Sequence, residues 1–238
     1  MSSILTEEID NIYQFKDKDC FFRSHFKKLL ASNYKYYGIK TAVLHKAAER
    51  IAQKLSLEEM MKLEPLDYEE LTLLGLAIVY SNSPFEEKLK GVDYFLSIND
   101  NWAASDIVAN SIKVKDKVFF DYLVGLLDKD IWHVKFAINA FMFHYLNEEF
   151  LDDVLNVLVK VDSEDNFVVK AVASFLAEAY LQYPQQIVEF IDTAPITMKA
   201  LRAMLVKVRL SKRIPEENKE LLEEIYKDVI CRRATLLK

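Results

Sequence analysis

The segment Trp132-His133-Val134-Lys135 recurs along the chain, and its recurrence decides which fold the sequence predicts. Each copy is an apolar residue followed three positions later by a lysine, and the other copies are Phe167-Val-Val-Lys170 and Ile196-Thr-Met-Lys199. The lysines are 35 and 29 residues apart, which is the length of a two-helix repeat. A looser copy without the lysine, Trp102-Ala-Ala-Ser105, precedes the first by 30 residues.

Stacked helix pairs of this length build an α-solenoid, in which equivalent helices lie side by side. Residues that recur at one position of the repeat are therefore expected to face a common groove. Chance similarity among amphipathic helices is the alternative. It is disfavoured because four copies follow one another along the chain at similar spacing. We predict an all-α fold, an α-solenoid of stacked antiparallel helix pairs that is superhelical with a concave groove. No long linker interrupts the array, so residues 1–238 are expected to form a single domain.

The composition agrees with a helical chain. Four glycines and five prolines in 238 residues are too few for a β-barrel or a β-sandwich, which need frequent turns. Apolar residues at three-four spacing predict amphipathic helices, as in residues 150–159 and 201–208. We expect about ten or eleven helices. Five of them are predicted to begin at the N-cap residues Thr41, Asp67, Ser83 (followed by Pro84), Asp100 and Asp130.

Several functional classes are excluded by what the sequence lacks. The four glycines stand alone, so no phosphate-binding loop of the Walker or Rossmann kind is present. No apolar stretch approaches the roughly 20 residues that cross a bilayer, and no signal-peptide pattern is present, so a cytoplasmic location is expected. Cys20 and Cys231 lack CxxC spacing, which predicts reduced and mostly buried thiols. The four histidines show no metal-ligand spacing, so we expect neither a metal nor a cofactor.

Charge is segregated along the chain, although the formal net charge is only -6. Residues 23–54 carry eight basic residues and one acidic residue, and residues 197–213 carry six basic residues and no acidic one. Acidic residues cluster at 58–70 and 148–165. This distribution predicts a surface with a basic side and an acidic side, so the overall charge does not exclude a polyanionic partner.

Two rows of cations are predicted to be free for an external anion. Lys46, Arg50 and Lys54 follow one another at four-residue spacing and share one edge of a helix. The second row lies off the apolar stripe of residues 201–208 and consists of Lys199, Arg202 and Lys207. A solvated charged face is the usual explanation for one such row. Two rows toward opposite ends of a curved solenoid favour a nucleic acid that spans the groove.

Trp102 and Asp106 are the sharpest local feature of the sequence. They are four residues apart on a predicted helix, so they place an indole beside a carboxylate on one face. A packed tryptophan and a solvated aspartate are the alternative interpretation. Trp102 occupies the repeating position, and Lys135 occupies the equivalent neighbourhood one repeat later. These positions favour a site where an indole, an anion and a cation converge.

Taken in order, these segments resemble those of the AlkD-like DNA alkylation repair family, which are HEAT-like-repeat DNA glycosylases. The resemblance runs through most of the chain, and each segment alone is only modestly specific. The segments are Tyr37-Gly-Ile-Lys-Thr41, Asn101-Trp-Ala-Ala-Ser-Asp106, Ile131-Trp-His-Val-Lys135, Lys170-Ala-Val-Ala-Ser-Phe175-Leu and Lys199-Ala-Leu-Arg202.

The resemblance implies a protein that cups duplex DNA and removes N3- or N7-alkylated purines without gripping the base in a base-flipping pocket. It implies that Asp106 is the catalytic carboxylate and that Trp102 lies beside the deoxyribose. Lys135 stands where the family has an arginine, and it would hold a phosphate. Ser174 stands where a second tryptophan is expected, with Phe175 next to it. The expected DNA contacts are Lys40, Lys46, Arg50, Lys54, Lys170, Lys199 and Arg202.

Three functions stay open at this point. The first is a monofunctional alkylpurine DNA glycosylase. The second is a noncatalytic binder of damaged or branched DNA that uses the same groove. The third is a HEAT-like scaffold for another protein, because concave solenoid surfaces commonly bind proteins. Duplex DNA is the expected partner in the first two cases, no membrane is expected to be one, and a chain of this length is expected to act as a monomer.

Overall fold

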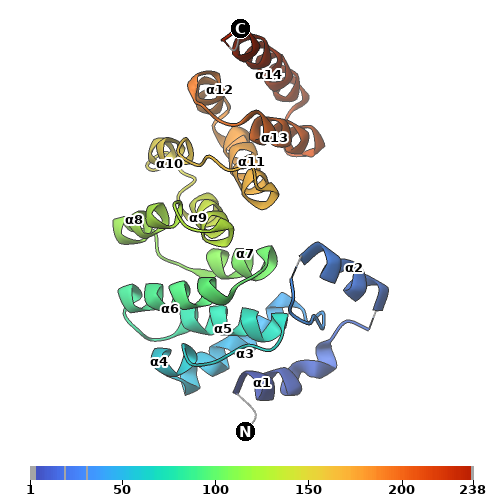
Figure 1. Cartoon of the computed structure of the whole chain (residues 1–238), viewed down its shortest axis with the longest axis vertical. Helices are drawn as coiled ribbons and strands as arrows, with labels where there is room; N and C mark the ends of the chain where they lie inside the picture. The colour runs from blue at the N-terminus through green and yellow to red at the C-terminus, as the bar shows by residue number, and fades with distance from the viewer. Residues whose placement is uncertain (1–3, 19, 31, 237–238) are drawn as a thin grey trace. The chain divides into compact units, whose positions relative to one another are not determined.

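The computed structural model describes residues 4–18, 20–30 and 32–236, and this part of the chain contains fourteen α-helices, one short 3-10 helix and no strand (Figure 1). Helices account for 73% of the described residues, and alternate helices pack against one another. The predicted all-α solenoid of stacked helix pairs is thereby confirmed. The chain divides into two compact units, Met1–Lys113 and Val114–Lys238, which are described separately. The single domain stays a prediction.

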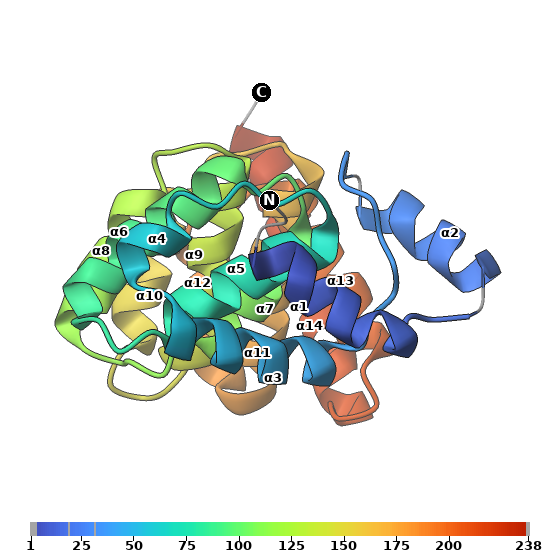
Figure 2. The same ribbon diagram turned by 90° about the horizontal axis from the view of Figure 1, so that it is seen from below.

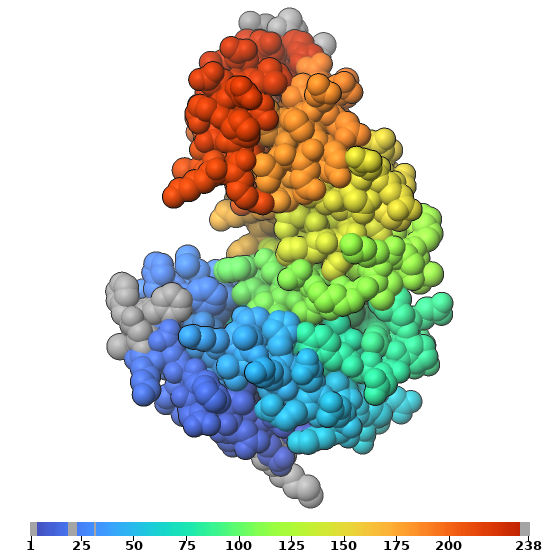
Figure 3. Space-filling view, turned by 180° about the vertical axis from the view of Figure 1, so that it is seen from behind, coloured from blue at the N-terminus to red at the C-terminus, as the bar shows by residue number. Residues whose placement is uncertain are grey.

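Unit 1, Met1–Lys113, is built around α5 (Tyr68–Tyr80), whose residues from Tyr68 to Ile78 are all buried. It packs against α3 (Thr41–Lys54) and against α7 (Trp102–Ser111). The remaining elements are α1 (Ile4–Ile12), η1 (Tyr13–Phe15), α2 (Cys20–Leu30), α4 (Leu57–Met60) and α6 (Phe85–Ile98). Of these, α1, α4 and α6 also contact α5, whereas α2 lies to one side of the unit in two views (Figures 1 and 2). Figure 3, which is turned by 180° from Figure 1, shows the face of unit 1 that includes α3 and α4.

Unit 2, Val114–Lys238, repeats this arrangement around α11 (Asn166–Gln182). It packs against α9 (Ile131–His144) and α13 (Met198–Leu210), so these three helices form a row like that of α3, α5 and α7. The second layer and the C-terminal helix are α8 (Lys117–Leu126), α10 (Leu151–Leu158), α12 (Pro184–Thr193) and α14 (Glu216–Leu236). The predicted apolar stripes are confirmed, because Leu151, Val154, Leu155 and Leu158 on α10 are all buried.

Two of the five predicted helix starts are confirmed by their caps. The Asp67 carboxylate accepts a hydrogen bond from Glu70 N at 2.8 Å, and that of Asp130 accepts one from Trp132 N at 2.9 Å. The prediction of Asp100 is wrong by one residue, because Asn101 caps α7. The physical reason is that the Asp100 carboxylate is already engaged, since it accepts hydrogen bonds from Ser32 Oγ at 2.6 Å and Asn33 N at 2.8 Å.

The other two predicted starts are also displaced by one residue. Helix α3 begins at Thr41 itself, after Lys40, which gives no side-chain cap, and α6 begins at Phe85, after Pro84. The predicted ten or eleven helices are too few for the described ranges, which hold fourteen. Helix α4 is hard to predict from the sequence because it has only four residues. A Ser56–Glu59 capping box stabilises it.

Gly75 brings α5 close to its neighbours. A Cβ atom on Gly75 would lie 2.5 Å from Cγ2 of Val108 on α7 and 2.9 Å from ring atoms of Phe95 on α6. Both distances are shorter than van der Waals contact, so a larger side chain fits only if the side chains of Val108 and Phe95, or the helices that carry them, shift. The glycine thus sets the distance at which α7 packs on α5, and α7 carries the candidate site.

The longest helix, α14, spans 21 residues and is rich in charged side chains. Within the described ranges, no helix combines the length and the apolar character needed to cross a membrane. Cys231 lies on α14 with its side chain exposed, so the prediction of a mostly buried thiol is wrong for this residue. It lies on the solvent side of a helix that packs through other positions, such as Leu222 and Val229. The side chain of Cys20 lies outside the described ones.

Candidate functional site

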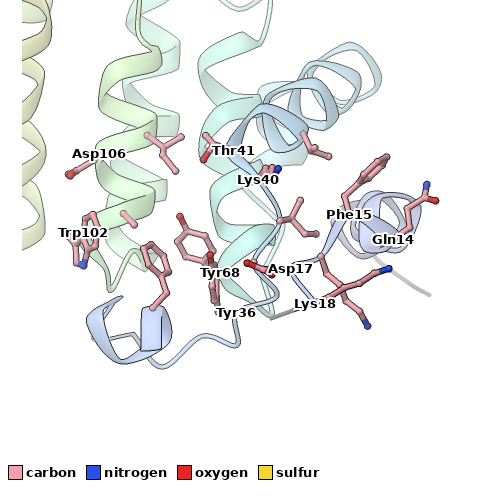
Figure 4. A pocket seen from close by; sticks show the side chains of 17 residues that line it. Gln14, Phe15, Asp17, Lys18, Tyr36, Lys40, Thr41, Tyr68, Trp102 and Asp106 are labelled. Atoms are coloured by element: carbon pink, nitrogen blue, oxygen red, sulfur yellow. The ribbon is translucent and has the colours of Figure 1, made fainter. Parts of the chain in front are cut away.

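Unit 1 contains a half-open cavity of about 920 Å³ next to α7 (Figure 4). Such a volume is ample for a small-molecule or nucleotide group. Its walls come from η1 and the loop after it, α2, the loop before α3, the first residues of α3, α5 and α7. The residues that line it include Gln14, Phe15, Lys16, Asp17, Lys18, Phe26, Tyr36, Gly38, Lys40, Tyr68, Trp102 and Asp106.

Trp102 and Asp106 both line this cavity, as half-buried side chains on the same side of α7 (Figure 4). The Asn101 cap fixes the start of the helix by accepting a hydrogen bond from Ala104 N at 3.0 Å. The indole Nε1 of Trp102 donates to the Leu29 carbonyl on α2 at 2.8 Å. The indole ring also meets that of Phe26, with centroids 6.1 Å apart. The indole is therefore held in place by α2.

Aromatic rings continue from Trp102 into the cavity. Phe26 lies 5.0 Å from Tyr36, and Tyr36 lies 5.3 Å from Tyr68 between ring centroids. Burial, with the charges of Glu69 and Asp17, raises the pKa of Tyr36 to about 12. Burial also raises the pKa of Tyr68. Both hydroxyls are therefore neutral near pH 7, so the aromatic wall carries no charge of its own.

Glu69 positions the loop that forms the floor of the site. Its carboxylate is fully buried and accepts hydrogen bonds from Tyr37 N at 3.0 Å, Gly38 N at 2.8 Å and Ile39 N at 3.3 Å. Gly38 has a φ of +80°, a conformation that favours glycine, and a Cβ there would lie 2.8 Å from Cβ of Asp17. Burial raises the pKa of Glu69 to about 7, although the hydrogen bonds from the loop oppose this shift.

The arrangement is suited to stabilising positive charge. Asp106 presents a half-buried carboxylate beside Trp102 at the edge of the cavity, where an electrostatic interaction is stronger than in water. Its charge also contributes to the raised pKa of Tyr68. Faces of aromatic rings attract cations in addition. A developing cation at this position would therefore be stabilised by Asp106 and by the ring of Trp102 together.

Of the predicted DNA contacts in unit 1, Lys40 lines the cavity and is exposed. Lys46 is exposed on α3, outside the cavity. Arg50 and Lys54 contact the carboxylate of Glu8 at 2.7 Å and 3.1 Å, and Glu8 is only 2% exposed. Burial acts to raise the pKa of Glu8, but the two cations outweigh it and hold the pKa below its ordinary value. Arg50 and Lys54 thus have an internal partner that the sequence did not reveal.

The four remaining predicted cations belong to unit 2. Lys170 and Arg202 are exposed, whereas Lys135 is only 7% exposed. Lys199 Nζ donates to the Glu164 carbonyl at 2.5 Å and lies 3.6 Å from a carboxylate oxygen of the same residue. Trp102 and Asp106 are thus brought together with Lys40 in one cavity, and the roles of the cations in unit 2 stay predictions.

The helix caps give the repeat a register that the sequence pattern missed. The N-caps of α7, α9, α11 and α13 are Asn101, Asp130, Asp165 and Thr197. The residue five positions after each cap is Asp106, Lys135, Lys170 and Arg202, respectively. The third equivalent cation, after Lys135 and Lys170, is therefore Arg202 rather than Lys199. Trp132 and Phe167, at the second position after their caps, contact each other with ring centroids 5.0 Å apart.

The position expected to hold a second tryptophan offers no aromatic side chain. Ser174 Oγ donates a hydrogen bond to the Lys170 carbonyl of its own helix at 2.7 Å. The neighbouring Phe175 is fully buried in the core of unit 2. Phe175 therefore does not present a ring at the surface in place of the missing indole.

Sequence reasoning missed a large part of the cavity wall. Gln14, Phe15 and Lys18 lie on the side opposite Trp102 and Asp106 (Figure 4). Together with Lys16, which also lines the cavity, they come from the segment Tyr13-Gln-Phe-Lys-Asp-Lys18. Two aromatic residues are followed by two lysines in this segment, a signal that could have been noticed. Phe26 and Tyr68 carry no comparable signal, because a buried aromatic residue on a helix is ordinary.

The fold and the cavity define an all-α solenoid protein whose candidate site is the carboxylate of Asp106 beside the ring of Trp102, in a half-open cavity that also contains aromatic and basic side chains. A family model described as DNA alkylation repair enzyme matches residues 13–205, and the chain belongs to this family. The match extends from η1 to α13 and therefore includes all the residues that line the cavity. Comparisons with curated proteins and with solved structures return no match.

Proposed function

We propose that this DNA alkylation repair protein binds duplex DNA and excises purines that carry an alkyl group at N3 or N7. The observation that carries the proposal is the placement of Asp106 and Trp102 in one aromatic cavity. Family membership supports a role in alkylation repair. The expected cytoplasmic location and monomeric state are part of the proposal.

The proposed reaction uses the charge of the damaged base. An N3- or N7-alkylated purine is already cationic, so it leaves with both electrons of the C1′–N bond and becomes neutral without being protonated. Positive charge then develops on the deoxyribose, and the carboxylate of Asp106 stabilises it. Water adds to C1′ and loses a proton to Asp106 or to solvent. The ring of Trp102, held by the Leu29 carbonyl, shields the sugar and adds a cation–π attraction.

Exposed cations would hold the phosphates of the DNA. Lys40 is placed for this at the cavity, and Lys46, Lys170 and Arg202 are the other exposed cations of the expected set. Lys135, which the resemblance implies as a phosphate ligand, is only 7% exposed and is therefore the least accessible cation of this proposal. Arg50, Lys54 and Lys199 contribute less in this proposal, because each has an acidic residue or a carbonyl as a partner.

Noncatalytic binding of damaged or branched DNA is the second candidate function. It is favoured by the position of the missing tryptophan, where Ser174 is turned to its own helix and Phe175 is fully buried. Loss of an aromatic neighbour would weaken a site that relies on stabilising a sugar cation. The two functions share the DNA-binding surface and differ only in whether the base is released.

The variant Asp106→Asn separates these functions. It keeps the shape of the side chain and removes its charge, so base release should fall by about 10²- to 10³-fold while DNA binding changes little. Asp152→Asn, at an exposed position on α10, is the matched control and should leave both unchanged. Release of alkylpurine from methylated duplex DNA is measured next to electrophoretic retardation of the same DNA. Equal release by the two variants would contradict the role of Asp106.

A further inference from the structure

The rim of the cavity opposite Asp106 combines exposed aromatic rings with lysines. Phe15 is 52% exposed and Tyr13 is 38% exposed, which is unusual for side chains of this size. Gln14, Lys16 and Lys18 flank them in the same short segment. In Figure 4, Gln14, Phe15 and Lys18 lie across the cavity from Trp102 and Asp106, with Lys40 between the two sides.

The charge of this rim is available to an external anion. Within the described ranges, no acidic side chain forms an ion pair with Lys16, Lys18 or Lys40, unlike Arg50 and Lys54 on α3. Asp17 is the one acidic residue in the segment, and in Figure 4 it lies between Lys18 and Tyr68, on the inner side of the rim. The outer side therefore presents positive charge.

Contacts between aromatic rings and lysines also hold the segment Tyr13–Lys18 in place. Lys16 Nζ lies 3.9 Å from the centroid of the Tyr13 ring, and the Tyr13 ring meets that of Tyr37 edge-on at 5.3 Å. Lys35 Nζ lies 4.6 Å from the centroid of the Tyr37 ring. The backbone is tied down as well, because Asp17 N donates to the Gly38 carbonyl at 3.1 Å. The rim is thus connected to the loop that Glu69 holds.

We propose that this rim, formed by Gln14–Lys18 and Lys40, binds a single strand of DNA that continues from the nucleotide at Asp106. Lys16, Lys18 and Lys40 hold its phosphates, and the exposed ring of Phe15 stacks on an unpaired base. This inference rests on the proposed function. Cations that follow a backbone, combined with aromatic rings that stack on bases, are the general means of binding single strands. The rim therefore favours duplexes with a gap or a flap over intact ones.

The test compares two double variants by fluorescence anisotropy over a series of salt concentrations. Lys18→Gln/Lys40→Gln removes two charges from the rim, and Lys62→Gln/Lys90→Gln removes two exposed charges elsewhere in unit 1. With a gapped duplex as the probe, the slope of log K against log salt should become shallower by about 1.4 to 1.8 in the rim variant alone. Equal slopes in the two variants would overturn the phosphate contacts.

Phe15→Ala tests the stacking, since this exposed side chain can be removed without opening the core. It should reduce the preference for gapped over intact duplex by about tenfold, because one stacked base contributes about 1–3 kcal/mol. An unchanged preference would overturn the stacking role. If rim variants bind like the wild type while Asp106→Asn abolishes base release, this inference fails and the proposed function stands. If the rim variant loses slope but no form releases base, the rim stands and the excision fails.

Discussion

Glu69 holds three consecutive backbone N–H groups of the loop Tyr37–Ile39 from within the core of unit 1. The loop carries Gly38 at its positive φ and forms the floor of the cavity. A charge so far from water is costly, so burial raises the pKa of Glu69 to about 7. The protonation of one buried residue is thereby coupled to the geometry of the site.

This raised pKa predicts that the stability of the protein falls as pH rises from about 4.5 to about 7. The unfolded chain has already released this proton above pH 4.5 or so, whereas the folded chain keeps it until about pH 7. The contribution to the free energy of unfolding that is lost over this window is on the order of 3 kcal/mol.

Urea unfolding at pH 5 and pH 7.5 measures this effect, with Glu69→Gln as the variant that cannot titrate. The difference between the two pH values should be smaller in the variant than in the wild type. Asp67, whose pKa burial raises to about 6, also titrates in this window and is present in both proteins, so a smaller pH dependence is expected to remain in the variant. A wild-type protein that is more stable at pH 7.5, or a variant with the same pH dependence, would contradict the prediction.

At the scale of single residues, the sequence predicts partly exposed functional side chains better than buried ones. The spacing of Trp102 and Asp106 is enough to place both on one face of a helix, and both line the cavity. Glu69 lies in an acidic stretch that resembles a solvated surface, and nothing local shows that it is buried. The burial and ion pairs of Glu8 are equally hard to predict, because its partners Arg50 and Lys54 are more than forty residues away in the sequence.

Two glycines test how the helices pack. Gly75→Ala places a Cβ 2.5 Å from Val108 Cγ2, so it should lower the free energy of unfolding by about 1–3 kcal/mol. Gly125→Ala on α8 meets no atom within 4 Å, so it should raise that free energy by about 0.5–1 kcal/mol through helix propensity. Urea denaturation followed by circular dichroism compares them. Similar effects of the two substitutions would contradict the close approach of α5 and α7.

Helices are predictable here because their apolar periodicity is strong, and their ends are less so. Asp67 and Asp130 are found as caps, whereas Asp100 is displaced by hydrogen bonds from Ser32 and Asn33, which are distant in the sequence. The repeat is found from its lysines, but its register follows from the caps and places Arg202 at the equivalent position. Local patterns reveal that an element exists, and tertiary contacts decide where it starts.

For the whole molecule, the uneven charge predicts DNA binding through a subset of the cations. Lys170→Gln/Arg202→Gln removes two exposed charges from equivalent positions of α11 and α13, so binding should weaken and its salt dependence should become shallower by about 1.8. Lys199→Gln is the contrasting variant, because Lys199 donates a hydrogen bond to Glu164. Its change in salt dependence should be smaller than half of the change in the double variant. The measurement is duplex affinity between low and moderate salt. A larger effect of Lys199→Gln would reverse the assignment.

The central claim is that the cavity of unit 1 releases alkylated purines from DNA. The most direct measurement incubates an excess of the wild-type protein with methylated duplex DNA and follows free N3-methyladenine and N7-methylguanine over time by chromatography. We expect release well above that of the same DNA without protein, and no release of unmodified purines, which lack the positive charge. Release equal to that of the DNA alone, from protein that still retards the duplex, would contradict the claim and identify a binding protein without excision.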